Sequence, residues 1–295
     1  MTEKDSVWQR VAVLGELVAF KHTVFSASFI LIAMIVSSVE VNGSAFFGFK
    51  TLFLCAIALL SARNFAMSFN RFCDRDIDAS NERTKNRPSV DGRMKAGYIM
   101  AFCLANAAAF VAVSYAINDL AFWLSIPFLI ILGFYSFMKR FSYLSHLVLG
   151  LSLGLAPLAG DIAVSGTLHL WTFFLCLGVL FWVAGFDILY SLQDIDHDRR
   201  SGLYSIPARF GAKDSMQIAR IAHILAVFCW ALFLRCSQTH NLALLGLLLS
   251  ACMLIYEHRL VSTDFMNIPK AFFTTNGYLG FVFLFFIILD SAVRF

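Results

Sequence analysis

Two short acidic segments contain the residues whose types and spacing are best suited to chemistry. Together they hold seven of the 19 acidic residues of the chain. They read Asn70-Arg-Phe-Cys-Asp74-Arg-Asp76-Ile-Asp78 and Asp187-Ile-Leu-Tyr190-Ser-Leu-Gln-Asp194-Ile-Asp196-His-Asp198. Asp74 and Asp194 are 120 residues apart, and so are Asp78 and Asp198. The shared offset predicts a two-fold internal repeat.

Within each segment the important spacing is four residues, which places side chains on one face of a helix. Like charges at this spacing repel each other, whereas a bound divalent cation would make the arrangement favourable. Mg²⁺ prefers one or two carboxylates, waters and phosphate oxygens. We therefore expect two sites that hold a diphosphate through bridging Mg²⁺, in preference to two charged helix ends that only terminate membrane spans. Asp76 and Asp196 lie off this face and are expected to meet solvent or a basic partner. The two expected ladders are Asn70-Asp74-Asp78 and Tyr190-Asp194-Asp198.

Basic residues follow each acidic segment. Lys85, Arg87 and Arg209 could neutralise the charge of a diphosphate, although Lys and Arg in such loops also set membrane topology. Arg63 is different, because it lies inside an apolar stretch, seven residues before Asn70. An Arg buried in a membrane is costly and normally has a partner or a function, so we expect Arg63 to face the site.

Composition places these segments in a membrane. The chain has 295 residues, of which 59% are hydrophobic and only 14% charged, whereas a soluble domain carries about 25% charged residues. A helix needs about 20 mostly apolar residues to cross a bilayer. The stretches that qualify are 17–39, 48–70, 96–117, 119–138, 143–164, 169–191, 214–235, 240–259 and 272–292. We therefore predict an all-α polytopic membrane protein with nine transmembrane helices, organised as one domain over residues 1–295.

The distribution of Lys and Arg predicts the orientation, because these residues favour the cytoplasmic side of a membrane. They are concentrated in the loops 71–95, 139–142 and 199–213, whereas the loops of the other parity hold very few. This asymmetry predicts a multi-pass protein of the inner (cytoplasmic) membrane whose N-terminus and acidic segments lie on the cytoplasmic side. The segments 79–95 and 199–213 are the candidates for loops that close over a substrate.

At this point the motifs resemble a known family. The segments Arg63-x6-Asn70-Arg-x2-Asp74-x3-Asp78, Glu82-Arg83-Thr84-x2-Arg87-Pro88, Tyr135-x3-Lys139-Arg140 and Asp187-x2-Tyr190-x3-Asp194-x3-Asp198 are similar to those of the UbiA superfamily of intramembrane aromatic prenyltransferases. The resemblance covers essentially the whole chain. It implies a nine-helix bundle around a central cavity that opens to two cytoplasmic cap loops and laterally to lipid.

The resemblance also implies the reaction and the role of each residue. Mg²⁺ would bridge the aspartates and a polyprenyl diphosphate, whose allylic C–O bond breaks so that an aromatic acceptor can attack. Metal and diphosphate would be held by Asn70, Asp74, Asp78, Asp194 and Asp198. The implied diphosphate contacts are Lys85, Arg87 and Lys139, with Arg209 as a further candidate. Tyr190 and Asp187 would border the reacting ring, with Asp187 helping to accept a proton, and Arg140 or Arg63 would hold an acceptor carboxylate.

Two sub-patterns within the family point to different acceptors. The segments 139–140 and 187–198 are similar to 4-hydroxybenzoate polyprenyltransferases of quinone biosynthesis. The segments Phe20-Lys-His-Thr-Val-Phe25 and Asn276-Gly-Tyr-Leu-Gly280 are similar to a sister group, some of whose members prenylate a dihydroxynaphthoate for menaquinone. Lys21 stands where that group commonly has an acidic residue. We favour 4-hydroxybenzoate and keep 1,4-dihydroxy-6-naphthoate as the alternative.

Two other classes of function fit these features less well. Internal repeats and intramembrane acidic residues also suit a cation-coupled transporter, but transporter sites usually lie near the bilayer midplane at broken helices. A catalytically silent scaffold has no need for two metal-sized acidic sites. Neither a nucleic acid nor an obligatory protein partner is expected, and the lipid bilayer is the surrounding partner.

Overall fold

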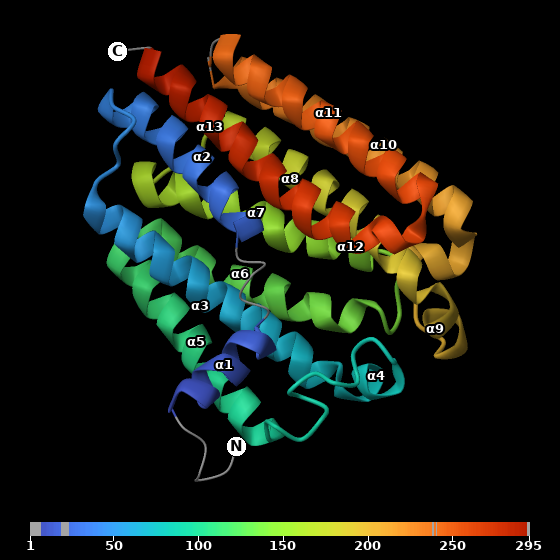
Figure 1. Ribbon diagram of the computed structural model, residues 1–295. Coiled ribbons are helices and arrows are strands. Elements are labelled where there is room, and N and C mark those ends of the chain that lie inside the picture. Colours follow the sequence, from blue (N-terminus) through green and yellow to red (C-terminus); the bar gives the residue numbers. More distant parts are fainter. Residues whose placement is uncertain (1–6, 19–23, 238, 240, 294–295) are drawn as a thin grey trace.

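The computed structural model describes residues 7–18, 24–237, 239 and 241–293, and this part of the chain folds into helices with no strand. The long helices pack side by side as a bundle (Figure 1). They are α2 (Val24–Asn42), α3 (Phe49–Cys73), α5 (Ala96–Ile117), α6 (Asp119–Met138), α7 (Ser145–Ser165), α8 (Leu170–Tyr190), α10 (Ile206–Cys236), α11 (Asn241–Thr263) and α13 (Asn276–Val293). The predicted all-α membrane fold is confirmed.

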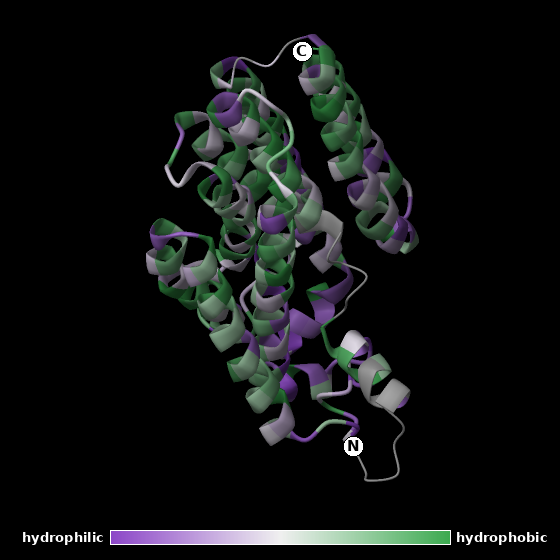
Figure 2. Cartoon of the chain, turned by 90° about the vertical axis from the view of Figure 1, so that its left-hand side faces the viewer, coloured by the Kyte–Doolittle hydropathy of each residue, from purple (hydrophilic) through white to green (hydrophobic). Residues whose placement is uncertain are grey.

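Eight of these helices are long and apolar enough to cross a bilayer, counting only the described residues. The remaining one, α2, contributes a shorter apolar stretch, Ala27–Asn42. Part of its predicted span, residues 19–23, lies outside the described residues. Hydrophobic residues dominate the long helices in Figure 2, and hydrophilic residues gather near the end of the bundle that holds the N-terminus. This end also carries the short helices α1 (Val7–Leu17), α4 (Arg75–Ser80) and α9 (Ile195–Arg200).

An aromatic cluster joins α2 to the C-terminal half of the bundle. Phe29, Trp182, Trp230 and Phe283 come from α2, α8, α10 and α13, and each is fully buried. The Phe29 ring centroid lies 5.1 Å from that of Trp182 and 5.4 Å from that of Trp230, and Trp230 lies 5.6 Å from Phe283. Such aromatic pairs add to the packing energy of their buried area. The cluster therefore holds α8, which carries the second acidic segment, against three neighbouring helices.

Small residues let α7 and α8 approach closely, as is common between membrane helices. A Cβ atom at Gly150 of α7 would lie 2.3 Å from the backbone oxygen of Leu180 in α8. The obstructing atom belongs to the backbone, so a side-chain rearrangement cannot relieve the clash. The absence of a side chain at Gly150 is therefore required for the two helices to keep this separation.

We expect Gly150→Ala to lower the free energy of unfolding by about 1–3 kcal/mol, the usual cost of overpacking. Thermal unfolding in detergent measures the effect. Gly97→Ala in α5 is the matched control, because no atom lies within 4 Å of a Cβ built there. Equal melting temperatures for the two variants would contradict the close α7–α8 contact.

The two acidic segments do not continue their helices in a straight line. Helix α3 ends at Cys73, and Asp74 adopts φ −95° and ψ 16° before α4 begins. Helix α8 ends at Tyr190, a 3-10 turn follows, and Asp194 adopts φ −105° and ψ 6° before α9 begins. The chain therefore turns at the central aspartate of each expected ladder, although the residues of both ladders line one cavity. Both turns fall at positions 120 residues apart, which supports the two-fold repeat.

The turn has a clear physical consequence for Asp78. After the turn, Asp78 is buried, its carboxylate pairs with Arg87, and its carbonyl oxygen accepts a hydrogen bond of 2.9 Å from the Thr84 hydroxyl. The contacts with the following loop thus favour the bent arrangement over a longer helix.

Candidate active site

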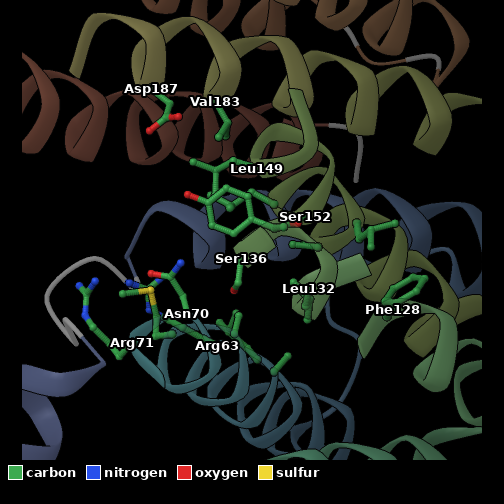
Figure 3. A pocket seen from close by; sticks show the side chains of 18 of the residues that line it. Arg63, Asn70, Arg71, Phe128, Leu132, Ser136, Leu149, Ser152, Val183 and Asp187 are labelled. Atoms are coloured by element: carbon green, nitrogen blue, oxygen red, sulfur yellow. The ribbon is translucent and has the colours of Figure 1, made fainter. Parts of the chain in front are cut away.

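One cavity of about 370 Å³ lies between α3, α5, α6, α7 and α8 and reaches both acidic segments. Its inner part is mostly apolar and includes Phe128, Leu132 and Leu149. Figure 3 shows Asp187 and Val183 on α8 across the cavity from Asn70 and Arg71 on α3. The cavity therefore has a charged end and an apolar interior, which suits a substrate with an anionic head and a hydrophobic tail.

The first acidic segment is organised by two local contacts. Asn70 donates a hydrogen bond of 2.7 Å from Nδ2 to Oδ2 of Asp74. Arg87 donates one of 2.5 Å from Nη1 to Oδ1 of Asp78, and Nη1 of Arg71 lies 3.9 Å from Oδ2 of the same carboxylate. Asp74 and Asp78 thus face the cavity from a short bent segment, with two guanidinium groups beside Asp78.

The second acidic segment is contacted by the loop that follows the first. Arg83 donates to both carboxylate oxygens of Asp194, at 3.1 Å from Nε and 2.7 Å from Nη2. Its remaining nitrogen, Nη1, donates to the hydroxyl of Tyr190 at 3.0 Å, and Asn81 Nδ2 donates to Asp194 at 3.2 Å. The bidentate geometry is the strong form of an Arg–carboxylate pair. Through Arg83, the two halves of the repeat are joined at the charged end of the cavity.

Charge and burial shift the titration of groups at this end. Burial and the neighbouring carboxylate of Asp78 raise the pKa of Asp74 to about 6, although Lys139 and Arg140 act in the opposite direction. Burial tends to lower the pKa of Lys139, but the carboxylates of the surrounding aspartates outweigh it and raise that pKa. The neighbouring carboxylates therefore favour the charged form of Lys139, and a nearby cation would stabilise the charged form of Asp74.

The donor set fits a hard divalent cation that is shared with a substrate. Of the residues that line the cavity, three have a buried carboxylate oxygen without a hydrogen-bond donor: Asp74 Oδ1, Asp78 Oδ2 and Asp198 Oδ2. No group of three His, Cys, Asp or Glu side chains in the described part of the chain converges on a single point. The protein can therefore offer one or two carboxylate oxygens to each ion, with water and phosphate completing the shell. This is the ligand set that Mg²⁺ prefers.

Most of the residues expected at the site line the cavity. They are Arg63, Asn70, Asp74, Asp78, Arg87, Lys139, Asp187, Tyr190, Asp194 and Asp198. Among the described residues, three expected substrate contacts lie outside this lining: Lys85, Arg140 and Arg209.

Each of these three cations has another partner. Lys85 pairs with Glu82 on the surface. Arg140 donates to both oxygens of Asp76, at 2.9 and 2.7 Å, and its Nη2 lies 3.7 Å from Oδ1 of Asp74. The guanidinium of Arg209 lies 4.7 Å from the ring centroid of Tyr143, a cation–π contact.

Through its pair with Arg140, Asp76 meets a basic partner, as expected, and the hydrogen bond from Arg140 lowers the pKa of Asp76 to about 2.

Four residues at or beside the cavity were not among the site residues expected from the sequence. Arg71, Arg83 and His197 line the cavity but were assigned no site role. His146 is fully buried, and its Nδ1 lies 2.6 Å from Oδ2 of Asp187. The two residues are 41 positions apart, so no spacing rule could connect them. The available clue to His146 was that an ionisable residue lies in the first turn of an apolar span.

An aromatic contact holds Tyr190 at the cavity wall. Its ring centroid lies 4.3 Å from that of Phe272, which itself lies 5.2 Å from Phe186. Phe272 belongs to the π-helical turn η4 (Ala271–Thr275), just before α13, and also lines the cavity. With its hydroxyl accepting from Arg83, Tyr190 is fixed at both ends, and the aromatic surface beside it suits a planar ring.

The fold and the site together define a multi-pass membrane enzyme whose cavity is charged at one end and apolar inside. Residues 24–287 match the UbiA prenyltransferase family, and the chain belongs to this family. The enzyme is thus an aromatic prenyltransferase by class, and the transporter and scaffold alternatives are set aside.

Known relatives agree with this assignment over most of their length. The chain is 30% identical to the 4-hydroxybenzoate octaprenyltransferase of Tolumonas auensis over 79% of this chain and 81% of that protein. It is 28% identical to the enzyme of the same name from Pseudomonas syringae over 83% and 82%.

Two solved structures share the fold. The apo structure of a UbiA homolog from Aeropyrum pernix K1 superposes with a TM-score of 0.81 and 30% identity, covering 91% of this chain and 98% of that one. A UbiA homolog from Archaeoglobus fulgidus, bound to GPP and Mg²⁺, superposes with a TM-score of 0.69 at 19% identity, covering 95% and 99%.

Proposed function

We propose that the protein transfers a polyprenyl group from polyprenyl diphosphate to an aromatic carboxylic acid in a Mg²⁺-dependent reaction of quinone biosynthesis, with 4-hydroxybenzoate as the favoured acceptor. The observation that carries the proposal is the single cavity in which two acidic segments meet an apolar interior. The names of the curated relatives support the acceptor, and the Archaeoglobus fulgidus homolog bound to GPP and Mg²⁺ supports the donor and the metal.

The charged end of the cavity would bind the diphosphate. Asn70, Asp74 and Asp78 would hold one Mg²⁺, with Asp194 and Asp198 holding the other. Bound Mg²⁺ would supply charge neutralisation to the departing diphosphate. Lys139 is buried in the same region and would contact the diphosphate directly. Arg83 and Arg87, which pair with Asp194 and Asp78, bring two further guanidinium groups to the same place.

The remaining chemistry would fall to the cavity wall. Heterolysis of the allylic C–O bond leaves its electron pair on the diphosphate, and the ring carbon ortho to the hydroxyl forms the new C–C bond. Asp187 accepts the hydroxyl proton as the ring attacks; the proton on the attacked carbon then passes to the departing diphosphate, and Asp187 returns its proton to the ring oxygen, which restores the aromatic phenol. Phe128, Leu132 and Leu149 exclude water that would otherwise capture the allylic cation.

The acceptor carboxylate is better placed against Arg63 than against Arg140. Arg63 lines the cavity, whereas Arg140 is held outside it by Asp76. Figure 3 shows Arg63 on α3 below Ser136 in the inner part of the cavity. An Arg in an otherwise apolar membrane cavity is best explained by an anionic partner.

The motif that suggested a naphthoate acceptor has a packing role in the structure. Asn276 donates to Glu257 Oε1 at 2.7 Å and accepts from Trp182 Nε1 at 2.9 Å, which ties α13 to α11 and α8. A Cβ at Gly280 would lie 2.2 Å from Ser28 Oγ, so this glycine lets α13 approach α2. Lys21 lies outside the described residues. These contacts give no preference for the alternative acceptor.

We further propose a single prenyltransferase domain over residues 1–295, located in the inner (cytoplasmic) membrane with its active site on the cytoplasmic side. The Lys- and Arg-rich loops 71–95 and 199–213 support this orientation, because they lie at the same end of the bundle as the acidic segments. No obligatory protein partner is part of the proposal.

The direct test supplies purified protein in lipid discs with labelled geranyl diphosphate and Mg²⁺. Two acceptors are compared in parallel, 4-hydroxybenzoate and 1,4-dihydroxy-6-naphthoate, each with an EDTA control. We expect a prenylated product with 4-hydroxybenzoate that is lost with EDTA and restored by added Mg²⁺. A product with the naphthoate alone would move the acceptor assignment, and a product that persists in EDTA would contradict the metal.

A further inference from the structure

A buried histidine contacts Asp187 from outside the cavity. His146 lies in the first turn of α7, has no exposed surface, and places Nδ1 2.6 Å from Oδ2 of Asp187. The Asp187 side chain is 17% exposed and lines the cavity. One oxygen of this carboxylate is therefore engaged by the protein, while part of the group remains open to a bound acceptor.

The other nitrogen of His146 determines where its proton lies. Nε2 accepts a hydrogen bond of 3.3 Å from the backbone N–H of Ile206, the first residue of α10. An N–H at the start of a helix has no acceptor within that helix, and a buried one must find another partner. Because Nε2 accepts, the neutral ring carries its proton on Nδ1 and donates it to Asp187. This contact holds the Asp187 carboxylate in one orientation.

We propose that His146 is a positioning residue that fixes the Asp187 carboxylate for contact with the hydroxyl of the aromatic acceptor. The inference rests on the proposed function, because it gives Asp187 an acceptor to meet. The arrangement corresponds to a base oriented by a third group, which is a general pattern in active sites. His146 itself touches neither substrate and acts only through Asp187.

The hydrogen bond from Ile206 to His146 joins the site to the segment 201–206. Tyr204 donates its backbone N–H to the carbonyl of Lys139 at 2.8 Å, two residues before Ile206 contacts His146. This segment therefore holds backbone contacts with two residues beside the reacting groups. The position of this segment is therefore coupled to the backbone of Lys139 and to the side chain of His146.

Two substitutions separate the two hydrogen bonds of His146. Asn places an amide near the position of Nδ1, so His146→Asn can still donate to Asp187 but loses the contact with Ile206. Gln places its amide near Nε2, so His146→Gln keeps the contact with Ile206 and loses Asp187. We expect His146→Gln to lower kcat by roughly 10- to 100-fold, a part of the usual contribution of a general base, with the KM for geranyl diphosphate unchanged. His146→Asn should retain activity within about tenfold of the wild type, since it preserves the bond to the base.

Asp187→Asn, alone and combined with His146→Gln, gives a second measurement that does not depend on the Asn variant. If His146 acts through Asp187, the double variant should lose no more kcat than Asp187→Asn alone. Equal activity of His146→Asn and His146→Gln, or additive losses in the double variant, would overturn the inference while leaving the proposed function intact. Failure of the wild type to prenylate any aromatic acceptor would remove the proposed function and this inference together.

Discussion

Replacement of Asp74 or Asp194 by Asn is expected to reduce turnover by at least about a thousandfold, while the protein still folds. The substitution keeps the shape of the side chain but removes the negative charge that a divalent ion requires. Metal stabilisation of a leaving group is worth several kcal/mol, and about 1.4 kcal/mol corresponds to each factor of ten in rate. Steady-state release of diphosphate in the presence of 4-hydroxybenzoate measures the loss.

A matched control lies in the second acidic segment. Asp196 is exposed and faces away from the cavity lining in the described structure, so Asp196→Asn removes the same charge without touching the site. We expect its turnover to stay within a few-fold of the wild type, as is usual for surface substitutions. Near-normal turnover of both Asp74→Asn and Asp194→Asn, with unchanged thermal unfolding, would refute the assignment of the two metal sites.

The second large effect is expected at Lys139. This side chain lines the charged end of the cavity and is surrounded by the carboxylates of both acidic segments. Lys139→Met retains most of the volume but removes a charge that would stabilise the departing diphosphate. Removal of a single group that stabilises transition-state charge costs about 100- to 1000-fold in kcat, and we expect a loss in this range.

The neighbouring residue provides the comparison. Arg140 is next to Lys139 in the chain but lies outside the cavity lining; it pairs with Asp76 at 2.7 Å, and its Nη2 lies 3.7 Å from Oδ1 of Asp74. We expect Arg140→Gln to reduce kcat less than tenfold, because an exposed ion pair contributes about 0–1 kcal/mol. A larger loss at Arg140 than at Lys139 would restore the sequence-based expectation that Arg140 contacts substrate.

Much of the fold was accessible from hydropathy alone. The predicted spans 96–117 and 119–138 coincide with α5 and α6, because each is a continuous apolar segment between polar residues. Predicted ends were less accurate where the chain leaves the membrane. Helix α10 begins at Ile206 and not near 214. A short helical segment precedes the predicted span, and the two are separated by a kink at Gly211, which has a φ of 76°.

The acidic residues of the candidate site were also readable from the chain, because their spacing repeats at a constant offset. The cations were not. Arg83 follows the first segment but binds Asp194 of the second, and Lys85, two residues later, turns to the surface. Among basic residues in one loop, composition gives no means of telling which side chain enters the cavity.

By itself, the sequence determined the class of the molecule: a helical membrane bundle with two related acidic segments at one end. These properties are local, since hydropathy and i, i+4 spacing depend only on neighbouring residues. The tertiary structure alone decided the partners, including Arg83 with Asp194 and His146 with Asp187. Such pairs join residues 111 and 41 positions apart. Their contact depends on the path of loops and on which charges need a partner once water has been excluded.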